Sequence, residues 1–129
     1  MSNADVRALV QHAQALASNE RAAARQMRAV VTRGALNVKR DWQAGAVATA
    51  RRHARLYPAS VSYDVTPLPG GATAEIGPDK GRPQGALGNL LEFGSVHNPP
   101  HNDGGRALLA EEPRFAAQAA QVAARGMRL

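Results

Sequence analysis

The sequence contains no cysteine, so it offers neither a disulfide framework nor a cysteine-ligated metal site. A chain without disulfides is typical of assembly in a reducing cytoplasm. No run of about 18 apolar residues occurs, so we expect no membrane-spanning helix and no membrane partner. The first residues, Met1–Asp5, lack the basic and apolar stretches of a signal peptide, and we expect none.

Aromatic residues are also scarce, with one tryptophan, two tyrosines and two phenylalanines in 129 residues. They are not interleaved with the basic residues, so the chain offers few platforms on which bases could stack. A basic helix face could still contact phosphates without reading sequence. Sequence-specific binding of nucleic acid is therefore not the function that this composition favours.

The common motifs of enzymes are missing as well. Glycines occur within Gly77–Gly85, but no Gly-Lys-Ser/Thr follows them, as a phosphate loop requires. There is no Gly-x-Ser-x-Gly element and no cysteine nucleophile. Glu111 and Glu112 are adjacent, so on a helix they would point in different directions and could not form a paired-carboxylate site. We predict that the protein is not an enzyme and has no cofactor.

His97, His101 and Asp103 form the one group of residues with the chemistry of a divalent-metal site. Pro99 and Pro100 lie between the histidines and exclude a regular helix, so the four-residue spacing does not place both rings on one face. A polar loop at an interface explains these residues better, and we predict no metal site.

Charge is distributed unevenly. The net charge is +6, but residues 1–56 carry ten basic and three acidic side chains, whereas residues 57–129 carry six basic and seven acidic ones. This asymmetry indicates that the first part of the chain meets a negative partner, either nucleic acid or an acidic protein ring. A solvated basic helix face would give the same pattern.

The first part of the chain has the period of an α-helix. Ser2 and Asp5 have the spacing of a capping box, and apolar residues follow at steps of three and four. Residues 18–20 offer a break, although no glycine or proline enforces one. A longer helix is predicted over 20–56, ending before Pro58. Its apolar stripe is Met27, Val30, Val31, Ala35, Val38, Trp42, Ala46 and Ala50, with Trp42 expected in the core.

The second part changes to the period of a strand. Residues 61–65 and 72–76 alternate between apolar and polar and predict an antiparallel hairpin around a turn at 67–71. Residues 77–85 predict a loose polar loop. Residues 90–94 fit either a third strand or a short helix, and Pro113 fits the first position of a last helix ending near Met127.

These elements predict an α+β fold in one domain, 1–129, with long N-terminal helices packed on a small antiparallel β-sheet and a C-terminal helix. The helical part is 1–56, the β part is 57–96, and the loop with the C-terminal helix is 97–129. An isolated hairpin is marginally stable, so the sheet must pack on the long helix.

Leu90-Leu91-Glu92-Phe93-Gly94-Ser95 resembles a signature of the HK-ninety-seven-type tail-component family, the neck and tail-completion proteins of long-tailed bacteriophages. The resemblance extends over about residues 20 to 125 as an order of elements. It includes the hairpin, the strand exit at 76–78, the loop at 98–101 and the proline-aromatic entry to the last helix at 113–115.

The resemblance implies a structural virion protein that forms a closed ring at the head–tail junction and is assembled in the host cytoplasm. Its partners would be itself, the adjoining head-connector (stopper) protein, and a tail terminator or tail-tube protein. DNA in the lumen could be contacted without specificity. The loops at 77–89 and 96–105 would contact neighbours and become ordered on assembly. Tail completion, tail termination and a head-side connector all remain open.

We predict that the subunit or ring interface includes Leu91, Glu92, Phe93 and Gly94, together with Arg21, Arg25 and Arg28. Gly94 would allow a positive φ or a close approach. Phe93 is expected in the core of its own subunit, with an inter-subunit contact as the alternative. Glu92 would pair with a neighbouring arginine or remain exposed. The alternative function is a basic DNA-binding accessory protein that uses the helix at 20–56.

Overall fold

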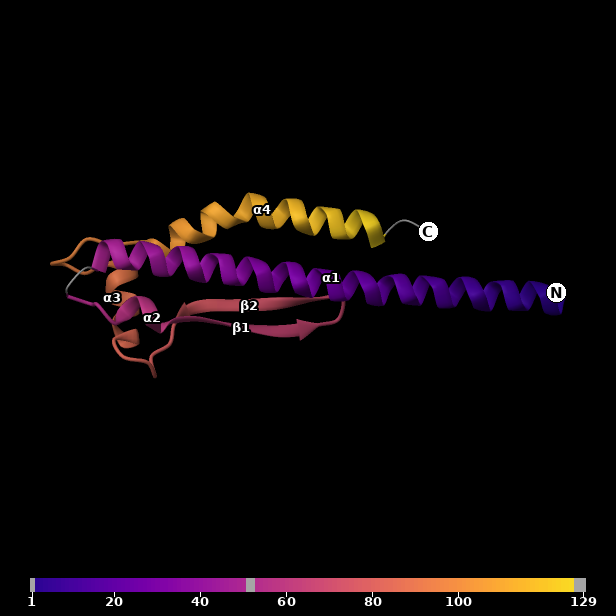
Figure 1. Cartoon of the computed structure of the whole chain (residues 1–129), viewed down its shortest axis with the longest axis horizontal. Coiled ribbons are helices and arrows are strands. Elements are labelled where there is room, and N and C mark those ends of the chain that lie inside the picture. Colours follow the sequence, from indigo (N-terminus) through magenta and orange to yellow (C-terminus); the bar gives the residue numbers. More distant parts are fainter. Residues whose placement is uncertain (1, 51–52, 127–129) are drawn as a thin grey trace.

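The computed structural model describes residues 2–50 and 53–126 and is built around one long helix. A hairpin packs along one side of this helix, and the last helix packs along another side (Figure 1). This arrangement confirms the predicted α+β fold. The elements in chain order are α1 (Asn3–Ala50), α2 (Tyr57–Ser60), β1 (Val61–Leu68), β2 (Gly71–Pro78), the 3-10 turn η1 (Gly85–Leu87), α3 (Gly88–Phe93) and α4 (Asp103–Gly126).

Helix α1 begins at the predicted capping box. The Ser2 hydroxyl oxygen accepts the Asp5 backbone N–H at 3.1 Å, and the Ser2 backbone N donates to the Asp5 carboxylate at 3.1 Å. The hydrogen bonds from Ser2 lower the pKa of the Asp5 carboxyl below its ordinary value. No break occurs at residues 18–20, so the two helices considered from the sequence are one helix.

The end of the long helix was predicted too late. Helix α1 ends at Ala50, residues 51–52 lie outside the described residues, and residues 53–56 form turns. Pro58 does not stop a preceding helix but lies at the start of α2. A proline suits the first turn of a helix because the N–H that it lacks would have no partner there.

The core follows the predicted stripe of α1, in which Val31, Ala35, Val38, Ala46 and Ala50 are all buried. Near the end of α1 a cluster of small side chains closes around one tyrosine. It contains Ala46, Ala50, Ala54 and Tyr57, with Trp42, Leu87 and Leu91 packed against it. Alanine contributes little buried area, so the core is thin for a chain of this length.

Hairpin β1–β2 has the predicted antiparallel pairing, from Val61 opposite Pro78 to Leu68 opposite Gly71. The strands extend further than the sequence indicated, so the turn contains only Pro69 and Gly70. Gly70 has φ of +78°, which a residue with a side chain rarely adopts.

The segment after the hairpin is more ordered than predicted. The Asp79 backbone N–H donates to the Ser60 carbonyl at 2.8 Å, and the Leu56 N–H donates to the Gln84 side-chain oxygen at 2.6 Å. A Cβ at Gly85 would lie 1.8 Å from the Asp79 carbonyl oxygen. The predicted loop is confirmed at 79–84, between β2 and η1, but the expectation that it is too polar to pack was wrong, because its polar groups bond within the chain. Of the two alternatives for 90–94, the structure has the short helix, α3.

Helix α4 starts earlier than predicted, at Asp103, so Pro113 lies inside the helix and not at its first position. A proline inside a helix removes one backbone hydrogen bond and favours a bend. Helix α4 is indeed bent along its length (Figure 1). The predicted end near Met127 lies outside the described residues. Within the described parts of the chain, no helix has the length and apolar character to cross a membrane.

Candidate subunit interface

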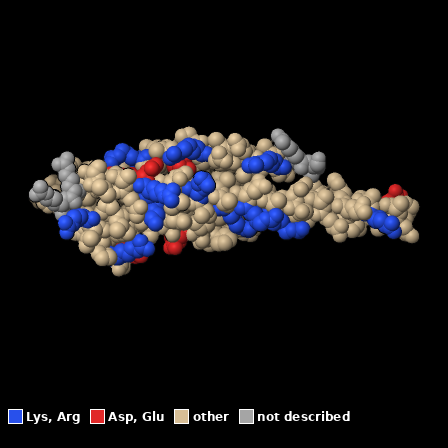
Figure 2. Space-filling view, viewed as in Figure 1, with Lys and Arg blue, Asp and Glu red and all other residues tan. Residues whose placement is uncertain are grey.

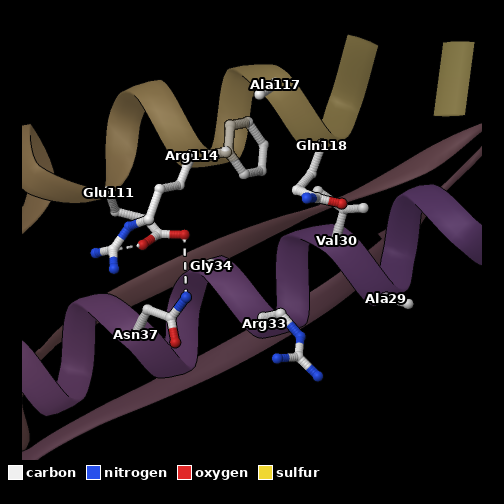
Figure 3. A pocket seen from close by; sticks show the side chains of 10 residues that line it. Ala29, Val30, Arg33, Gly34, Asn37, Glu111, Arg114, Ala117 and Gln118 are labelled. Carbon is white, nitrogen blue, oxygen red and sulfur yellow. Dashed lines mark hydrogen bonds and ion pairs between the residues drawn. The ribbon is translucent and has the colours of Figure 1, made fainter. Parts of the chain in front are cut away.

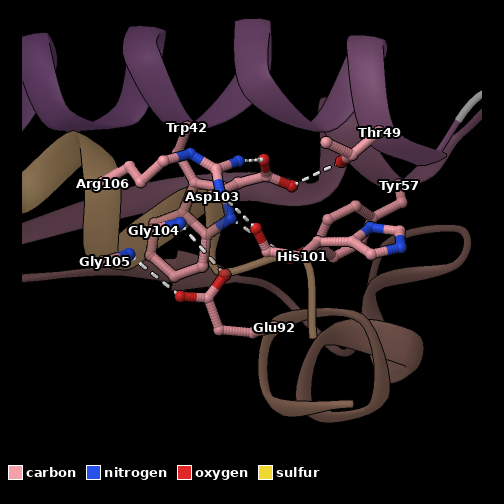
Figure 4. Close-up of polar contacts among 9 residues, drawn as sticks. All are labelled: Trp42, Thr49, Tyr57, Glu92, His101, Asp103, Gly104, Gly105 and Arg106. Atoms are coloured by element: carbon pink, nitrogen blue, oxygen red, sulfur yellow. Dashed lines mark hydrogen bonds and ion pairs between the residues drawn. The ribbon is translucent and has the colours of Figure 1, made fainter. Parts of the chain in front are cut away.

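Glu92 of α3 is bound inside its own subunit. Its carboxylate accepts the backbone N–H of Gly104 and of Gly105, each at 3.0 Å (Figure 4). Both groups belong to the first turn of α4, where N–H groups have no partner within the helix and attract negative charge. Only 8% of Glu92 is exposed. The prediction that Glu92 pairs with a neighbouring subunit or remains exposed was wrong, because this carboxylate caps α4.

Asp103 makes the second link to α4. Its carboxylate accepts the Thr49 hydroxyl at 2.7 Å and pairs with Arg106, while the residue itself is buried. Its side chain also lies directly over Gly45, where a Cβ would come within 2.9 Å of a carboxylate oxygen. Glu92 and Asp103 together fix the start of α4 against α3 and α1.

Trp42 and Tyr57 lie beside these carboxylates (Figure 4). The indole N–H donates to the Tyr57 hydroxyl at 3.2 Å, and the indole ring covers Gly104. Trp42 packs against the alanine cluster but is only half-buried, so its predicted core position is confirmed in part. Burial raises the pKa of the Tyr57 hydroxyl, the hydrogen bond from Trp42 opposes that shift, and the charges of Glu92 and Asp103 add to it.

The other three residues of the predicted 91–94 interface differ in their burial. Leu91 packs against the alanine cluster. Gly94 has φ of +78°, as predicted, and a Cβ there would lie 2.7 Å from the backbone N of Pro100. Phe93 is 74% exposed, so its predicted place in the core was wrong. Val96 is 96% exposed, so Phe93 and Val96 are two exposed apolar side chains close together in the sequence after α3 begins.

The three arginines predicted at the interface also differ from one another. Arg21 and Arg25 are exposed on α1. Arg28 instead holds the hairpin tip, because its guanidinium donates to the Leu68 carbonyl at 2.9 Å and to the Gly71 carbonyl at 3.0 Å. Arg28 is therefore a structural residue, and of these three arginines Arg21 and Arg25 are the ones exposed to a partner.

The histidine-containing loop does not gather metal ligands. His97 is exposed, His101 is half-buried, and the Asp103 carboxylate is already bonded to Thr49 and Arg106. Among the described residues, no three histidine, aspartate or glutamate side chains are placed to hold one metal ion.

Two shallow grooves flank the contact between α1 and α4. One has a mixed lining that includes Arg33, Asn37 and Gln118 (Figure 3). In it, Glu111 is buried, accepts the Asn37 amide at 3.2 Å and pairs with Arg114 at 2.9 Å. These contacts place polar groups of the chain along one side of the groove, which has a volume of about 550 Å³.

The other groove is mainly apolar and is called the hairpin groove below. Helix α1 forms its floor, and α4 and β2 form its walls. Its lining is Val31, Gly34, Ala35, Val38, Ala72, Ala74, Ile76, Leu108, Glu111, Glu112 and Phe115. The small side chains of β2 leave the space between the hairpin and α4 unfilled.

The sequence pattern indicated neither the cap formed by Glu92 nor the hairpin groove. The pair Gly104–Gly105 was a usable signal for the first, because glycines at a helix start let an acceptor approach the backbone closely. The groove depends on how far α4 and the hairpin stand apart, which the period of each element does not encode.

Comparison of the chain with protein-family models, with curated proteins and with solved structures gives no match.

Proposed function

We propose that this chain is a structural virion protein of a long-tailed bacteriophage that assembles into a ring at the head–tail junction. Its excess of surface supports the self-assembly in this proposal. The chain exposes 8915 Å², whereas a compact monomer of 13.6 kDa would expose about 6,600 Å². The excess of roughly 2,300 Å² is what a subunit of an obligate assembly commonly buries.

Large apolar side chains are exposed at separate places, as a ring subunit requires. Three groups of them lie on the projecting part of α1, around the end of α3 and on the side of α4 that forms a wall of the hairpin groove. Each subunit of a ring meets two neighbours through two different surfaces, and the contacts close on themselves. The members of these three groups are Val6, Leu9, Val10, Leu16, Leu90, Phe93, Val96 and Leu108, while Val47, Leu56, Leu68 and Leu109 are exposed at other positions.

The likeness of Leu90–Ser95 and of the element order to the tail-component family supports the location within the virion. Phe93 and Val96 lie in an exposed segment that is separate from α4 and from the projecting part of α1. We assign them to the contact with an adjoining ring, either the head-connector (stopper) side or the side of the tail terminator and tail tube. Aromatic side chains are favoured anchors of such contacts.

A DNA-binding accessory protein is the second candidate, and exposed arginines favour it. On the face drawn in Figure 2, blue side chains spread over the body of the molecule, while most of the projecting helix is tan. The exposed arginines of α1 that follow the projecting part are Arg21, Arg25, Arg33 and Arg40. In a ring they would line the DNA passage or meet acidic faces of adjoining rings.

Two measurements on the purified chain separate the candidates. We expect closed annular particles by negative-stain electron microscopy at high protein concentration, and weak DNA affinity at physiological salt. Monomers that bind DNA tightly, with a steep loss of affinity as salt increases, would replace the ring with the DNA-binding function.

A further inference from the structure

The projecting part of α1, residues 3–19, has an apolar face with no cover from the rest of the described chain (Figure 1). Val6, Leu9, Val10 and Leu16 are each at least one third exposed. At about 100° per residue these four side chains lie on one side of the helix. Val31 and Val38 lie on that same side, so the exposed stripe continues the stripe that is buried in the body.

The sequence of residues 3–19 favours a helix even where no other part of the chain packs against it. The Ser2–Asp5 capping box bonds its first turn, and isolated helices of this length are marginal without such help. Within residues 3–19 the only charges are Asp5, which is held by Ser2, and Arg7. A nearly uncharged amphipathic helix suits a protein groove and offers little to a phosphate backbone.

The hairpin groove has the matching chemistry. It has a volume of about 480 Å³, an apolar floor on α1 and small side chains along β2. Leu108 forms its lip on α4 and is 58% exposed. The exposed carboxylate of Glu112 lies on the same wall and is complementary to Arg7. Apolar anchors at steps of three, four and seven residues are the usual way in which a helix fills such a groove.

A subunit cannot fill this groove with its own projecting segment, because α1 is one continuous helix that carries the segment away from the body (Figure 1). Pairing of two projecting segments with each other is disfavoured, because the free stripe spans only about two heptads and coiled coils require about three or four. The segment and the groove are thus two different surfaces on each copy.

We propose that residues 3–19 of one copy dock into the hairpin groove of the next copy, with Leu9 and Leu16 as anchors. The contact is head-to-tail, so successive copies form either a closed ring or a filament. Two such surfaces per copy account for a large part of the excess area. This inference rests on the self-assembly in the proposed function and adds the device that joins the subunits.

The test uses two variants, each of which keeps one of the two surfaces. Leu9→Arg with Leu16→Arg disables the segment, and Leu108→Arg disables the groove. Matched controls are Gln11→Arg, on the opposite side of the same helix, and Leu109→Arg, an exposed neighbour that does not line the groove. All five substituted positions are exposed, so circular dichroism should show unchanged folding.

Sedimentation and light scattering should show that each disabled variant is monomeric and that both controls assemble like the unchanged chain. An equimolar mixture of the two disabled variants should form a dimer and stop there, because one intact segment meets one intact groove. Self-association of the groove variant alone would overturn the proposal in favour of pairing between segments. A monomeric unchanged chain at about 1 mM protein would also overturn it.

Failure of the phage function gives a different result. One outcome is that the mixture forms head-to-tail dimers while both disabled variants still join heads to tails normally. That outcome would support the docking and contradict a ring at the head–tail junction. The opposite outcome is that the disabled variants fail to join heads to tails but their mixture forms no dimer. That outcome would support a role at the junction and contradict the docking.

Discussion

Phe115 of α4 rests on Gly34 of α1, so closely that a Cβ at Gly34 would lie 3.1 Å from Cδ2 of the ring. The missing side chain lets the two helices approach at this point. Phe115 lines both grooves and forms the ridge between them. This contact therefore sets the distance between α1 and α4, and with it the width of the hairpin groove.

Gly34→Val should push Phe115 away and lower the free energy of unfolding by about 1–3 kcal/mol, the range for overpacking in a filled site. Urea denaturation followed by circular dichroism measures the change. Valine has a higher helix propensity than glycine, so a loss of stability in Gly34→Val would come from packing; Ala44→Val, at an exposed position of the same helix, lowers propensity alone and should cost less than about 1 kcal/mol. A Gly34→Val protein as stable as the unchanged chain, or more stable, would show that the contact with Phe115 does not limit the approach of the helices.

Glu92→Ala should destabilise the fold by about 1–3 kcal/mol, because the N–H groups of Gly104 and Gly105 would lose their acceptor. Glu92→Gln should cost less, since its amide oxygen can still accept one of them. Thermal unfolding monitored by circular dichroism gives the order of the variants. Glu112→Ala, which removes an exposed carboxylate from α4, is the control. If Glu92→Ala is as stable as the unchanged chain but no longer self-assembles, Glu92 acts at the subunit interface and not as a cap.

The period of the sequence predicted the α+β class, the hairpin and the buried stripe of α1, because each of these depends on local patterns of polarity. It did not predict which parts of a stripe are covered. Val6, Leu9 and Leu16 have the same spacing as Val31 and Val38, yet the first three are exposed. Cover depends on where the hairpin and α4 end along α1, and that is a tertiary property.

The candidate site divides in the same way. The positive φ of Gly94 was predictable from its residue type. By contrast, Glu92 was predicted at the interface and Phe93 in the core, and the structure has Glu92 buried and Phe93 exposed. A glutamate in an amphipathic segment is ordinarily exposed. Here two glycines at the start of α4 lie within reach of its carboxylate, and this proximity across twelve residues of chain leaves no trace in the local pattern.

The raised pKa of Tyr57 predicts that the folded chain loses stability at alkaline pH. Its pKa is raised in the folded chain, chiefly by burial, above the value of about 10 that it has in an unfolded chain. The neutral hydroxyl therefore stabilises the fold below pH 10, and this contribution is lost as the pH rises through the folded-state pKa.

The free energy of unfolding should consequently fall as the pH is raised above about 10, which denaturant titrations at stepped pH would measure. Tyr57→Phe should be less stable at neutral pH, because it loses the hydrogen bond from Trp42, but it should show a shallower alkaline fall. Tyr63→Phe is the control for a tyrosine that is only half-buried. An equally steep fall in Tyr57→Phe would assign the alkaline transition to other groups.

The last prediction concerns Arg28, whose role differs from that of Arg21 and Arg25. The guanidinium of Arg28 bonds two carbonyl groups at the hairpin tip. Arg28→Gln should therefore lower the free energy of unfolding by about 1–3 kcal/mol, the usual cost of removing a charged donor from its acceptors. Hydrogen exchange should locate the loss, with faster exchange at Gly71 and its neighbours than at the Val61 end of the hairpin.

Arg21→Gln with Arg25→Gln is the matched variant, because it removes two exposed arginines from the same helix. Its stability should change by less than about 0.5 kcal/mol, since exposed charges contribute little. If it alone reduces the joining of heads to tails, Arg21 and Arg25 act at a contact between proteins. If it instead weakens a tight, salt-sensitive DNA complex, these two arginines serve the DNA-binding function. A stable Arg28→Gln hairpin would show that the tip is held by the strands alone.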